Sequence, residues 1–545
     1  MPSHSTGIEH FNKLVSQMRL ERQSFITHYK DLQQFIAPRK GRFFITDRNK
    51  GAKRHQAIIN SAGTQALRIG TAGMFNGTMN PSRPWFGLET FNPDLMESQD
   101  VRDWLYKVEI ILRTILNDGN FYNMVPVFLK ELLLFGTSFM THVDDFEHVA
   151  RFYTHTAGSY MLAQNDRLVI DTVAREYEWP VIQIVKKFGL ENISKVVRDA
   201  YDNGNYSSYY PLVHFIQPNE DYKEKSPLGI NKAFISVYYE PGNTGIDTNK
   251  FLSKGGFDTF PGYAGRWEVT EGDIYGVDCP GMTSLGDVKQ LQIEEKRKAQ
   301  AIDKMVNPPL QGPPNVRNVA VSGLPGSLVI YEGDNTKQRL EPVYTVDPRL
   351  QELRLDMDAV ERRINSAFFV DLFMAITQMQ GIQPKNQLDL THRDRERLTQ
   401  LGPVLERLQG EFQALMLDRL FNQCVAADIL PPAPEELVGQ PLNVRFISTL
   451  AMAQKAIVTT NIEKLAGFTS SLVQTGWPTA ADKFDADQAI DEYSRAIGVP
   501  PTVVLSDEDV AAVRQTRAEQ EQQQLELEQI QQIANVAKTG KEVLE

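Results

Sequence analysis

The chain has 545 residues, of which 41% are hydrophobic and 23% are charged, a balance typical of a folded globular protein rather than a disordered one. Its 69 acidic residues outnumber the 57 basic ones and give a formal net charge of −12, which argues against a protein that holds DNA by general neutralisation of phosphates. The two cysteines, Cys279 and Cys424, lie far apart in the sequence, which excludes a disulfide framework or a zinc ribbon and favours a reducing compartment.

The first residues contain no basic region followed by an apolar one, so the sequence predicts no secretory signal. No apolar window is long enough and uncharged enough to span a bilayer. We therefore expect a soluble protein that is made in a cytoplasm and has no membrane partner.

Apolar residues at helical spacing predict four helices before residue 136, at 8–36, 55–75, 99–116 and 121–135. The second of these is rich in small residues, so we expect it to be packed on most sides. After it, Pro81 and Pro84 predict an extended turn that presents Trp85 and Phe86.

The segment between the first two helices is the most basic part of the chain. Its cations are Arg39, Lys40, Arg42, Arg48, Lys50, Lys53 and Arg54. Two interpretations stay open: a solvated loop, or a surface for an acidic partner.

From residue 137 the pattern changes to β-branched and aromatic residues separated by polar turns, which predicts strands. The expected strands are 138–145, 148–154, 160–163, 168–177, 213–216 and 234–240, with two short helices at 180–188 and 192–201. A Gly-rich, aromatic segment without a predicted element follows at 255–267.

Two long helices joined by a polar loop form the expected spine of the second half. Apolar residues at three- and four-residue steps predict helices at 348–369 and 398–421, and the loop at 371–391 is rich in amides and almost uncharged. A charged helix is predicted earlier, at 285–306, and a proline-rich segment of about 40 residues with short strands separates it from the spine. Near the C-terminus we expect a strand at 443–447 and helices at 450–475, at 486–497 and from 506 onward.

The sequence offers no assembled catalytic site. It lacks the phosphate-binding loop GxxxxGK[ST], the dinucleotide motif GxGxxG, the hydrolase elbow GxSxG and the HExxH metal pair. Residues 142–148, which include His142, Asp144 and His148, resemble a metal site only in composition, and a turn between strands uses the same residue types. We therefore expect no enzyme activity, no cofactor and no metal.

Several segments, in order along residues 10 to 425, carry a family resemblance. They are Ala62-Gly-Thr, Ala72-Gly-Met-Phe, Asn80-Pro-Ser-Arg-Pro-Trp-Phe, Gly255-Gly-Phe-Asp-Thr-Phe-Pro, Arg266-Trp, Leu285-Gly-Asp-Val-Lys-Gln-Leu, Asn307-Pro-Pro-Leu, Arg393-Asp-Arg-Glu and Leu401-Gly-Pro-Val-Leu-Glu-Arg-Leu. Together they resemble the head-to-tail connector, or portal, proteins of short-tailed double-stranded DNA bacteriophages (podoviruses). The last 120 residues carry no such motif.

The resemblance implies an α+β fold, predominantly α-helical, that assembles as a ring, usually a dodecamer, at one capsid vertex of the virion. The implied regions are a wing at 1–284 with a β-rich part at 137–280, stem helices at 285–306 and 348–370, a clip at 307–347, a tunnel loop at 371–392, a wing helix and C-terminal part at 393–479, and a crown with a helical barrel at 480–545. Gly402 and Pro403 would kink or restart the wing helix.

The implied function is passive conduction of double-stranded DNA during packaging and ejection. The tunnel-loop candidates for contact with DNA are Gln378, Gln380, Gln383, Lys385 and Asn386, and the stem candidates are Lys289, Lys296 and Arg297. The clip would dock the packaging motor and later the tail through Pro308, Pro309, Pro313, Pro314 and Arg317. Salt bridges between subunits would explain the same stem charges, so both interpretations stay open.

The expected partners are further copies of the chain, DNA bound without sequence preference, the terminase motor, tail adaptor proteins, and the major capsid and scaffolding proteins. The host bacterial cytoplasm is the expected place of synthesis. An alternative is a structural adaptor of the head–tail junction that forms no pore.

Overall fold

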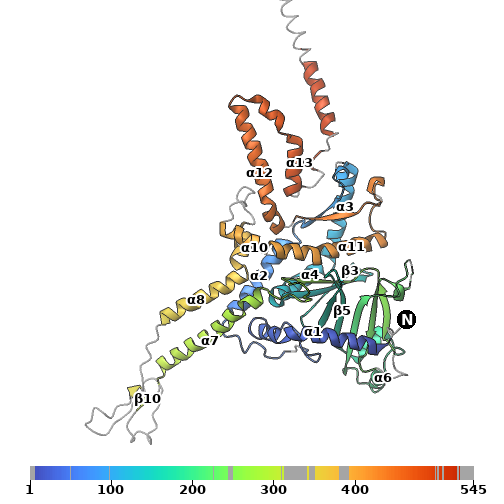
Figure 1. Ribbon diagram of the computed structural model, residues 1–545, viewed down its shortest axis with the longest axis vertical. Helices are drawn as coiled ribbons and strands as arrows, with labels where there is room; N and C mark the ends of the chain where they lie inside the picture. Colours follow the sequence, from blue (N-terminus) through green and yellow to red (C-terminus); the bar gives the residue numbers. More distant parts are fainter. Residues whose placement is uncertain are drawn as a thin grey trace, which may run out of the picture. The chain divides into compact units, whose positions relative to one another are not determined.

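The structure is a computed structural model (Figure 1). It describes residues 7–48, 51–96, 98–224, 226, 228–243, 250–308, 310–311, 341–342, 350–379, 392–437, 439–447, 449–497, 499, 503–505, 509–524 and 527. The chain forms two compact units: unit 1 comprises Met1–Gly73, Val127–Met140 and Thr154–Gln378, and unit 2 comprises Met74–Pro126, Thr141–Tyr153 and Met379–Glu545.

Unit 1 is built around a five-stranded antiparallel sheet with the order β4-β5-β6-β7-β8. The strands are β4 (Tyr160–Gln164), β5 (Ile170–Pro180), β6 (Tyr209–Pro218), β7 (Phe234–Tyr239) and β8 (Ser253–Phe257). The long helix α1 (Ile8–Phe35) buries its apolar stripe against one face of this sheet, where Phe11 contacts Phe215 edge to face. The short helices α5 (Val181–Phe188) and α6 (Lys195–Asp202) pack on strand residues that point to the opposite face of the sheet, such as Leu212.

A second sheet has the order β3-β2-β9, with β2 at Thr137–Asp145, β3 at Val149–His155 and β9 at Gly262–Arg266. The Gly-rich segment therefore contains two strands, β8 and β9, that the sequence did not predict. Glycine has low strand propensity, but at Gly256 a Cβ would collide with the carbonyl oxygens of Gly229 and Phe234, so close backbone approach requires glycine there.

Unit 2 contains the helices α3 (Gln99–Asp118), α10 (His392–Leu408), α11 (Ala414–Ala426), α12 (Thr449–Gln474) and α13 (Ala486–Ile497). It also contains the antiparallel pair of β1 (Phe86–Thr90) and β12 (Leu442–Phe446), in which Leu88 lies opposite Val444. Helix α4 (Phe121–Phe135) begins in this unit and ends in unit 1.

The prediction that Trp85 and Phe86 are presented at the surface was wrong. Their side chains are 1% and 0% exposed, and the Trp85 indole N–H donates to the Tyr122 hydroxyl at 3.0 Å. The two prolines do precede an extended segment, but it is strand β1, and its aromatic residues enter the core of unit 2.

Helices α7 (Pro280–Val306) and α8 (Leu350–Ala367) run side by side in unit 1 (Figure 1). The two-residue strands β10 (Leu310–Gln311) and β11 (Glu341–Pro342) pair beyond their ends. After α8, Phe369 adopts a left-handed backbone conformation with φ of 55°, and α9 (Val370–Met379) follows.

The expected helices at 8–36 and 121–135 are confirmed, and the fold is α+β with helices predominating. Several boundaries differ from the predicted ones, and α7, for example, begins five residues earlier than expected. Helix α2 (Ala62–Thr78) begins seven residues later than expected, and α9 occupies the first part of the predicted polar loop. Helix α10 continues through Pro403, so the helix does not restart there, and a π-helical segment follows at Gln409–Gln413. Among the described residues, no helix is both long and apolar enough to cross a bilayer.

Candidate functional site

The α7–α8 hairpin is the most distinctive feature of unit 1, and apolar contacts hold its base together. Val288 and Leu291 of α7 are buried, as are Met357, Val360 and Ile364 of α8. Their three- and four-residue spacing places each set on one side of its helix. At the edge of this contact, the Arg363 guanidinium pairs with the Asp287 carboxylate at 3.0 Å.

A loop before α2 ties both helices of the hairpin together. The Gln292 carboxamide oxygen accepts the backbone N–H groups of Ile59 and Asn60 at 2.6 and 2.8 Å, and its NH₂ group donates to the Asn60 carbonyl oxygen at 2.8 Å. The Asn60 side chain donates to the Glu361 carboxylate of α8 at 3.0 Å and accepts the Ala62 N–H that begins α2. The backbone groups of Ile59 and Asn60 therefore bind α7 instead of continuing α2 toward the N-terminus.

Helix α2 approaches the hairpin and α9 through its glycines. A Cβ at Gly63 would lie 2.8 Å from a Val288 methyl group, and a Cβ at Gly73 would overlap the Phe373 side chain. Close packing was expected from the small residues of this helix, but one stripe, which includes Arg68 and Ile69, is exposed.

The far half of the hairpin is exposed. From residue 293 onward no described residue of α7 is buried. Five apolar side chains are 42–79% exposed there: Ile293, Ile302, Met305, Val306 and Leu355. Exposure of these apolar side chains to water does not stabilise an isolated chain.

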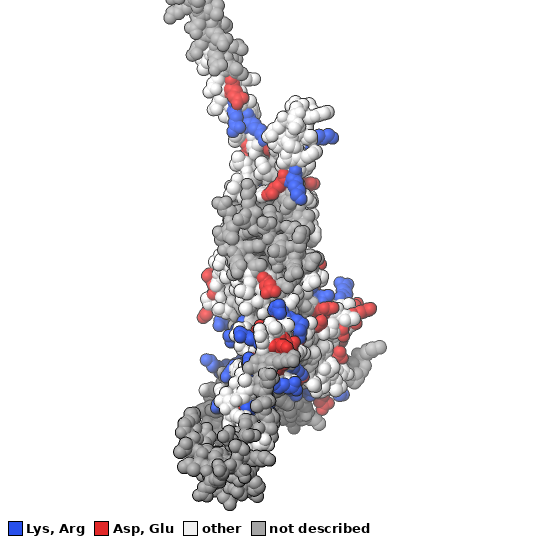
Figure 2. All heavy atoms as spheres, turned by 90° about the vertical axis from the view of Figure 1, so that its left-hand side faces the viewer, with Lys and Arg blue, Asp and Glu red and all other residues white. Residues whose placement is uncertain are grey.

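Three cations, Lys296, Arg297 and Lys304, form what we call the basic stripe. All three side chains are exposed, and no ion pair or hydrogen bond joins them to a described residue. Their spacing places them within about 100° of one another around the helix. On the face shown in Figure 2, positive and negative side chains are interspersed and form no continuous field of one sign.

Lys289, the third stem candidate from the sequence, differs from Lys296 and Arg297. Its ammonium group lies 2.6 Å from the Asp31 carboxylate of α1 and 5.3 Å from the centre of the Phe35 ring. Its charge is therefore partly neutralised within the chain. Lys304 was not among the stem candidates from the sequence. It lies on the same side of α7 as Lys296, and its position eight residues after Lys296 could have identified it.

Most other predicted site residues lie outside the described residues. These are Gln380, Gln383, Lys385 and Asn386 of the tunnel loop, and Pro309, Pro313, Pro314 and Arg317 of the clip. Gln378 lies in α9, and Pro308 follows the end of α7.

The residues of the cluster at 142–148 make separate contacts. His142 is fully buried 4.5 Å from the Phe152 ring, and burial together with the charge of Arg419 lowers its pKa to about 3. Asp144 pairs with Arg419 at 3.7 Å, whereas Asp145 pairs with Arg151 at 3.3 Å. In the part of the chain that the structure describes, no group of three or more His, Cys, Asp or Glu residues could hold a metal ion.

The basic loop after α1 pairs with acids of its own unit. Lys40 lies 3.5 Å from the buried Glu131 carboxylate, Arg48 lies 2.7 Å from that of Glu178, and Arg54 pairs with Asp47. Neither of the two interpretations from sequence anticipated this outcome, because Glu131 and Glu178 are distant in the sequence.

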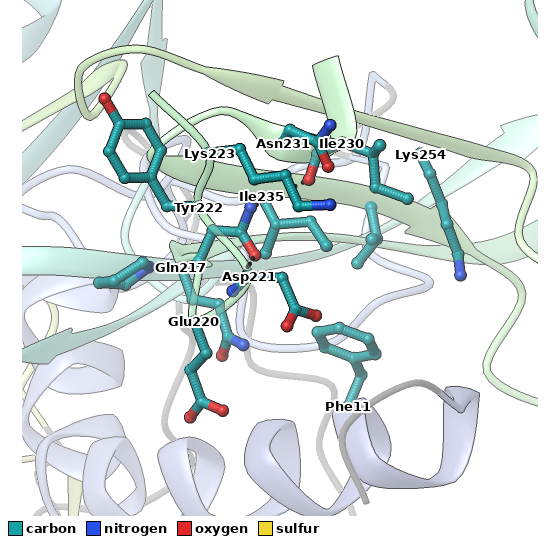
Figure 3. Close-up of a pocket in the computed structure, with 13 residues that line it drawn as sticks. Phe11, Gln217, Glu220, Asp221, Tyr222, Lys223, Ile230, Asn231, Ile235 and Lys254 are labelled. Carbon is teal, nitrogen blue, oxygen red and sulfur yellow. Dashed lines mark hydrogen bonds between the residues drawn. The ribbon is translucent and has the colours of Figure 1, made fainter. Parts of the chain in front are cut away.

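A cavity of about 380 Å³ lies between α1 and the loop after β6 (Figure 3). Phe11 lies on one side, and the loop and strand residues Asp221, Lys223 and Lys254 surround the space. Burial lowers the pKa of Lys254. The 13 lining residues include no serine, threonine, cysteine or histidine; their ionisable side chains are those of Glu220, Asp221, Tyr222, Lys223 and Lys254.

Comparison with known proteins gives consistent matches over nearly the whole chain. The family model "Bacteriophage head to tail connecting protein" matches residues 9–505, which extends the resemblance well beyond residue 425. The portal protein of Salmonella phage epsilon15 is 39% identical over 534 residues, covering 98% of this chain and 95% of that protein. The probable portal protein of Bordetella phage BPP-1 is 37% identical over 507 residues, covering 93% and 90%.

Solved structures of gene transfer agent particles are also similar to this chain. A chain from the neck of an empty particle matches with a TM-score of 0.37 and 11% identity, covering 85% of this chain and 96% of that chain. A chain from a native gene transfer agent virion matches with a TM-score of 0.35, also at 11% identity, covering 87% and 99%. The family model and the two phage relatives, which span almost the entire sequence, show that this chain belongs to the bacteriophage head-to-tail connecting protein family.

Proposed function

We propose that this chain is the portal subunit of a short-tailed phage and that a ring of its copies, a dodecamer, conducts double-stranded DNA through one capsid vertex. Membership of the connector family and the similarity to the two phage relatives support the portal assignment. The subunit is then a component of the virion at the head–tail junction.

The proposal that the subunits form a ring rests on the exposed apolar surface of the α7–α8 hairpin. Its base is anchored by buried residues, whereas its far half exposes Ile302, Met305, Val306 and Leu355. Neighbouring copies would remove this apolar surface from water, at about 25 cal/mol per Å². A heterologous contact repeated around an axis closes into a ring when its rotation divides a full turn, and builds an open filament when it does not.

We assign the two hairpin helices to the stem, and the basic stripe to the channel side of the stem. A few cations per subunit attract the DNA backbone, while the overall acidic charge of the chain keeps the attraction weak enough for sliding. The amide-rich segment that includes Gln380 and Gln383 is the proposed narrowing of the channel, because amides can hydrogen-bond phosphates without a fixed charge.

The proposed partners follow from the place of a connector between head and tail. The proline-rich segment after α7 would dock the terminase motor during packaging and the tail adaptor afterwards. The wing would contact capsid and scaffolding proteins. No catalytic role is proposed, since the sequence contains none of the catalytic motifs sought above.

Negative-stain electron microscopy and mass photometry of the full chain test this function. We expect rings with a central hole and a mass near that of a dodecamer of 61.7 kDa subunits. The variant Leu355→Asp should reduce ring formation, whereas Phe146→Asp, which changes an exposed apolar residue in a turn, should not. Closed particles without a hole would instead favour the alternative, an adaptor that forms no pore.

A further inference from the structure

Unit 2 contains a groove between the second half of α11 and the chain that follows it. The groove has a volume of about 530 Å³ and lies against Trp104 of α3. The Trp104 indole N–H donates to the Pro431 carbonyl oxygen at 3.0 Å, which fixes the proline-rich wall of the groove. Asp428, with φ of 53°, and Gly439, with φ of 81°, make the turns that bring this wall back along the helix.

The floor of the groove is apolar. Trp104 and Leu437 are buried beneath it, and Phe421 and Leu442 are half-buried along it. Val425, which also lines the groove, is 54% exposed. Such a floor accepts apolar side chains of a partner without requiring the protein to rearrange.

The rim of the groove carries negative charge only. Asp418 and Asp428 are the charged residues that line it, and the exposed Glu435 and Glu436 directly precede the lining residue Leu437 in the chain. None of these four carboxylates forms an ion pair with a described residue. The lone cation of residues 415–440, Arg419, is 7% exposed and pairs with Asp144 instead.

Burial also raises the pKa of the Asp418 carboxyl group, because no neighbouring cation offsets its desolvation. A cation placed beside Asp418 would therefore gain more than one placed beside a fully solvated carboxylate.

We propose that this groove docks a basic amphipathic segment of another protein of the phage particle, with apolar anchors on the Trp104–Phe421–Leu437 floor and Lys or Arg opposite the acidic rim. This partner assignment rests on the proposed function, since it places the chain in a particle with other proteins. Nucleic acid and anionic lipid do not fit, because their phosphates would meet the carboxylates of Asp418 and Asp428. The volume suits a few apolar side chains, as in other recognition of a helix by a groove.

A binding measurement with the full-length chain tests the chemistry of the site. The probe is a fluorescein-labelled amphipathic peptide with leucines four residues apart and lysines flanking them, and its matched control has glutamates in place of the lysines. We expect the lysine peptide to bind more tightly at low salt, and the double variant Asp418→Asn, Glu436→Gln to weaken its binding by about tenfold. The control variant Asp199→Asn, an exposed acid of α6, should bind as the unmodified chain does.

Mass photometry of each variant separates this proposal from the proposed function. Loss of rings in the groove variant would mean that the groove joins copies of this chain, which would overturn the assignment to another protein. Equal binding of the two peptides, or unchanged binding by the groove variant, would overturn the proposal while leaving the ring in place.

A crosslinking experiment in phage particles identifies the occupant. Photoreactive p-benzoylphenylalanine replaces Val425, and the crosslinked segment is sequenced by mass spectrometry. A basic, amphipathic segment from a different particle protein supports the proposal. Crosslinks only to another copy of this chain, or only to acidic segments, overturn it.

Discussion

The side-chain amide of Gln292 pairs with the backbone of Asn60 in both directions, accepting its N–H and donating to its carbonyl oxygen, each at 2.8 Å. This pairing resembles the contact between two strands, but it joins a helix to a loop. Because Asn60 also binds Glu361 of α8, one buried glutamine fixes the position of both hairpin helices.

Replacing Gln292 by alanine should therefore loosen the base of the hairpin. The change removes three hydrogen bonds and leaves backbone groups of residues 59 and 60 without their partners, so we expect the free energy of unfolding to fall by about 2–4 kcal/mol. Chemical denaturation checks this value. Gln300→Ala, an exposed glutamine of the same helix, is the control, and an equal loss in both variants would contradict the role of Gln292.

The contact between Gly73 and Phe373 should tolerate no side chain. Gly73→Ala would place a methyl group on the buried Phe373 side chain, and overpacking of this kind costs about 1–3 kcal/mol. Thermal unfolding measures the effect. Gly467→Ala in α12, where a Cβ meets nothing within 4 Å, should be neutral or stabilising, so a loss there as large as at Gly73 would refute the steric explanation.

Acid should destabilise the fold through its buried histidines. The pKa of His142 is about 3 in the folded chain, and burial also holds the pKa values of His155 and His214 well below 6.5. Because the folded pKa is depressed, each group contributes its full stability above pH 6.5 and loses it as the pH falls from 6.5 toward the folded pKa.

We therefore expect His142→Gln to lose less stability on acidification than the unmodified chain, by about 2–3 kcal/mol between pH 7 and pH 4.5. Denaturation curves at several pH values give the slope, which separates titration from any constant packing loss. Identical slopes for His142→Gln and the unmodified chain would rule out this source of acid sensitivity.

Neutralising the basic stripe should weaken the interaction of rings with double-stranded DNA. In the triple variant Lys296→Gln, Arg297→Gln, Lys304→Gln, the dependence of DNA affinity on salt should become shallower, by about 0.9 for each phosphate that the protein no longer neutralises. Fluorescence anisotropy at several salt concentrations measures this slope. The control changes three exposed lysines elsewhere in unit 1: Lys13, Lys186 and Lys195. If the stripe forms salt bridges between subunits instead, the triple variant will fail to form rings rather than fail to bind DNA.

Deleting residues 378–385 should leave rings assembled but impair packaging or retention of DNA, because the deletion removes Gln380, Gln383 and Lys385 from the proposed narrowing. Packaged DNA per particle, measured after nuclease treatment, is the readout. Normal packaging and retention in particles that carry the deletion would exclude this segment as the narrowing of the channel.

Local patterns alone determined much of the fold. The helical spacing of apolar residues in α1 and α4 and the β-branched and aromatic residues of β5 and β6 specify these elements, because periodicity and strand propensity depend mainly on neighbouring residues. The family resemblance likewise rested on short motifs, and the matching family model covers those motifs.

Long-range contacts decided the rest. Residues 55–61 were predicted as helix from their sequence but form a loop, in which Gln292, far along the chain, binds the backbone of Ile59 and Asn60. Strands β8 and β9 contain glycines, which have low strand propensity. At Gly256 of β8, neighbouring backbone carbonyl groups leave no room for a side chain. The ion pairs of the basic loop and the acidic rim of the α11 groove appear only once distant residues meet, because charge acts through space and not along the sequence.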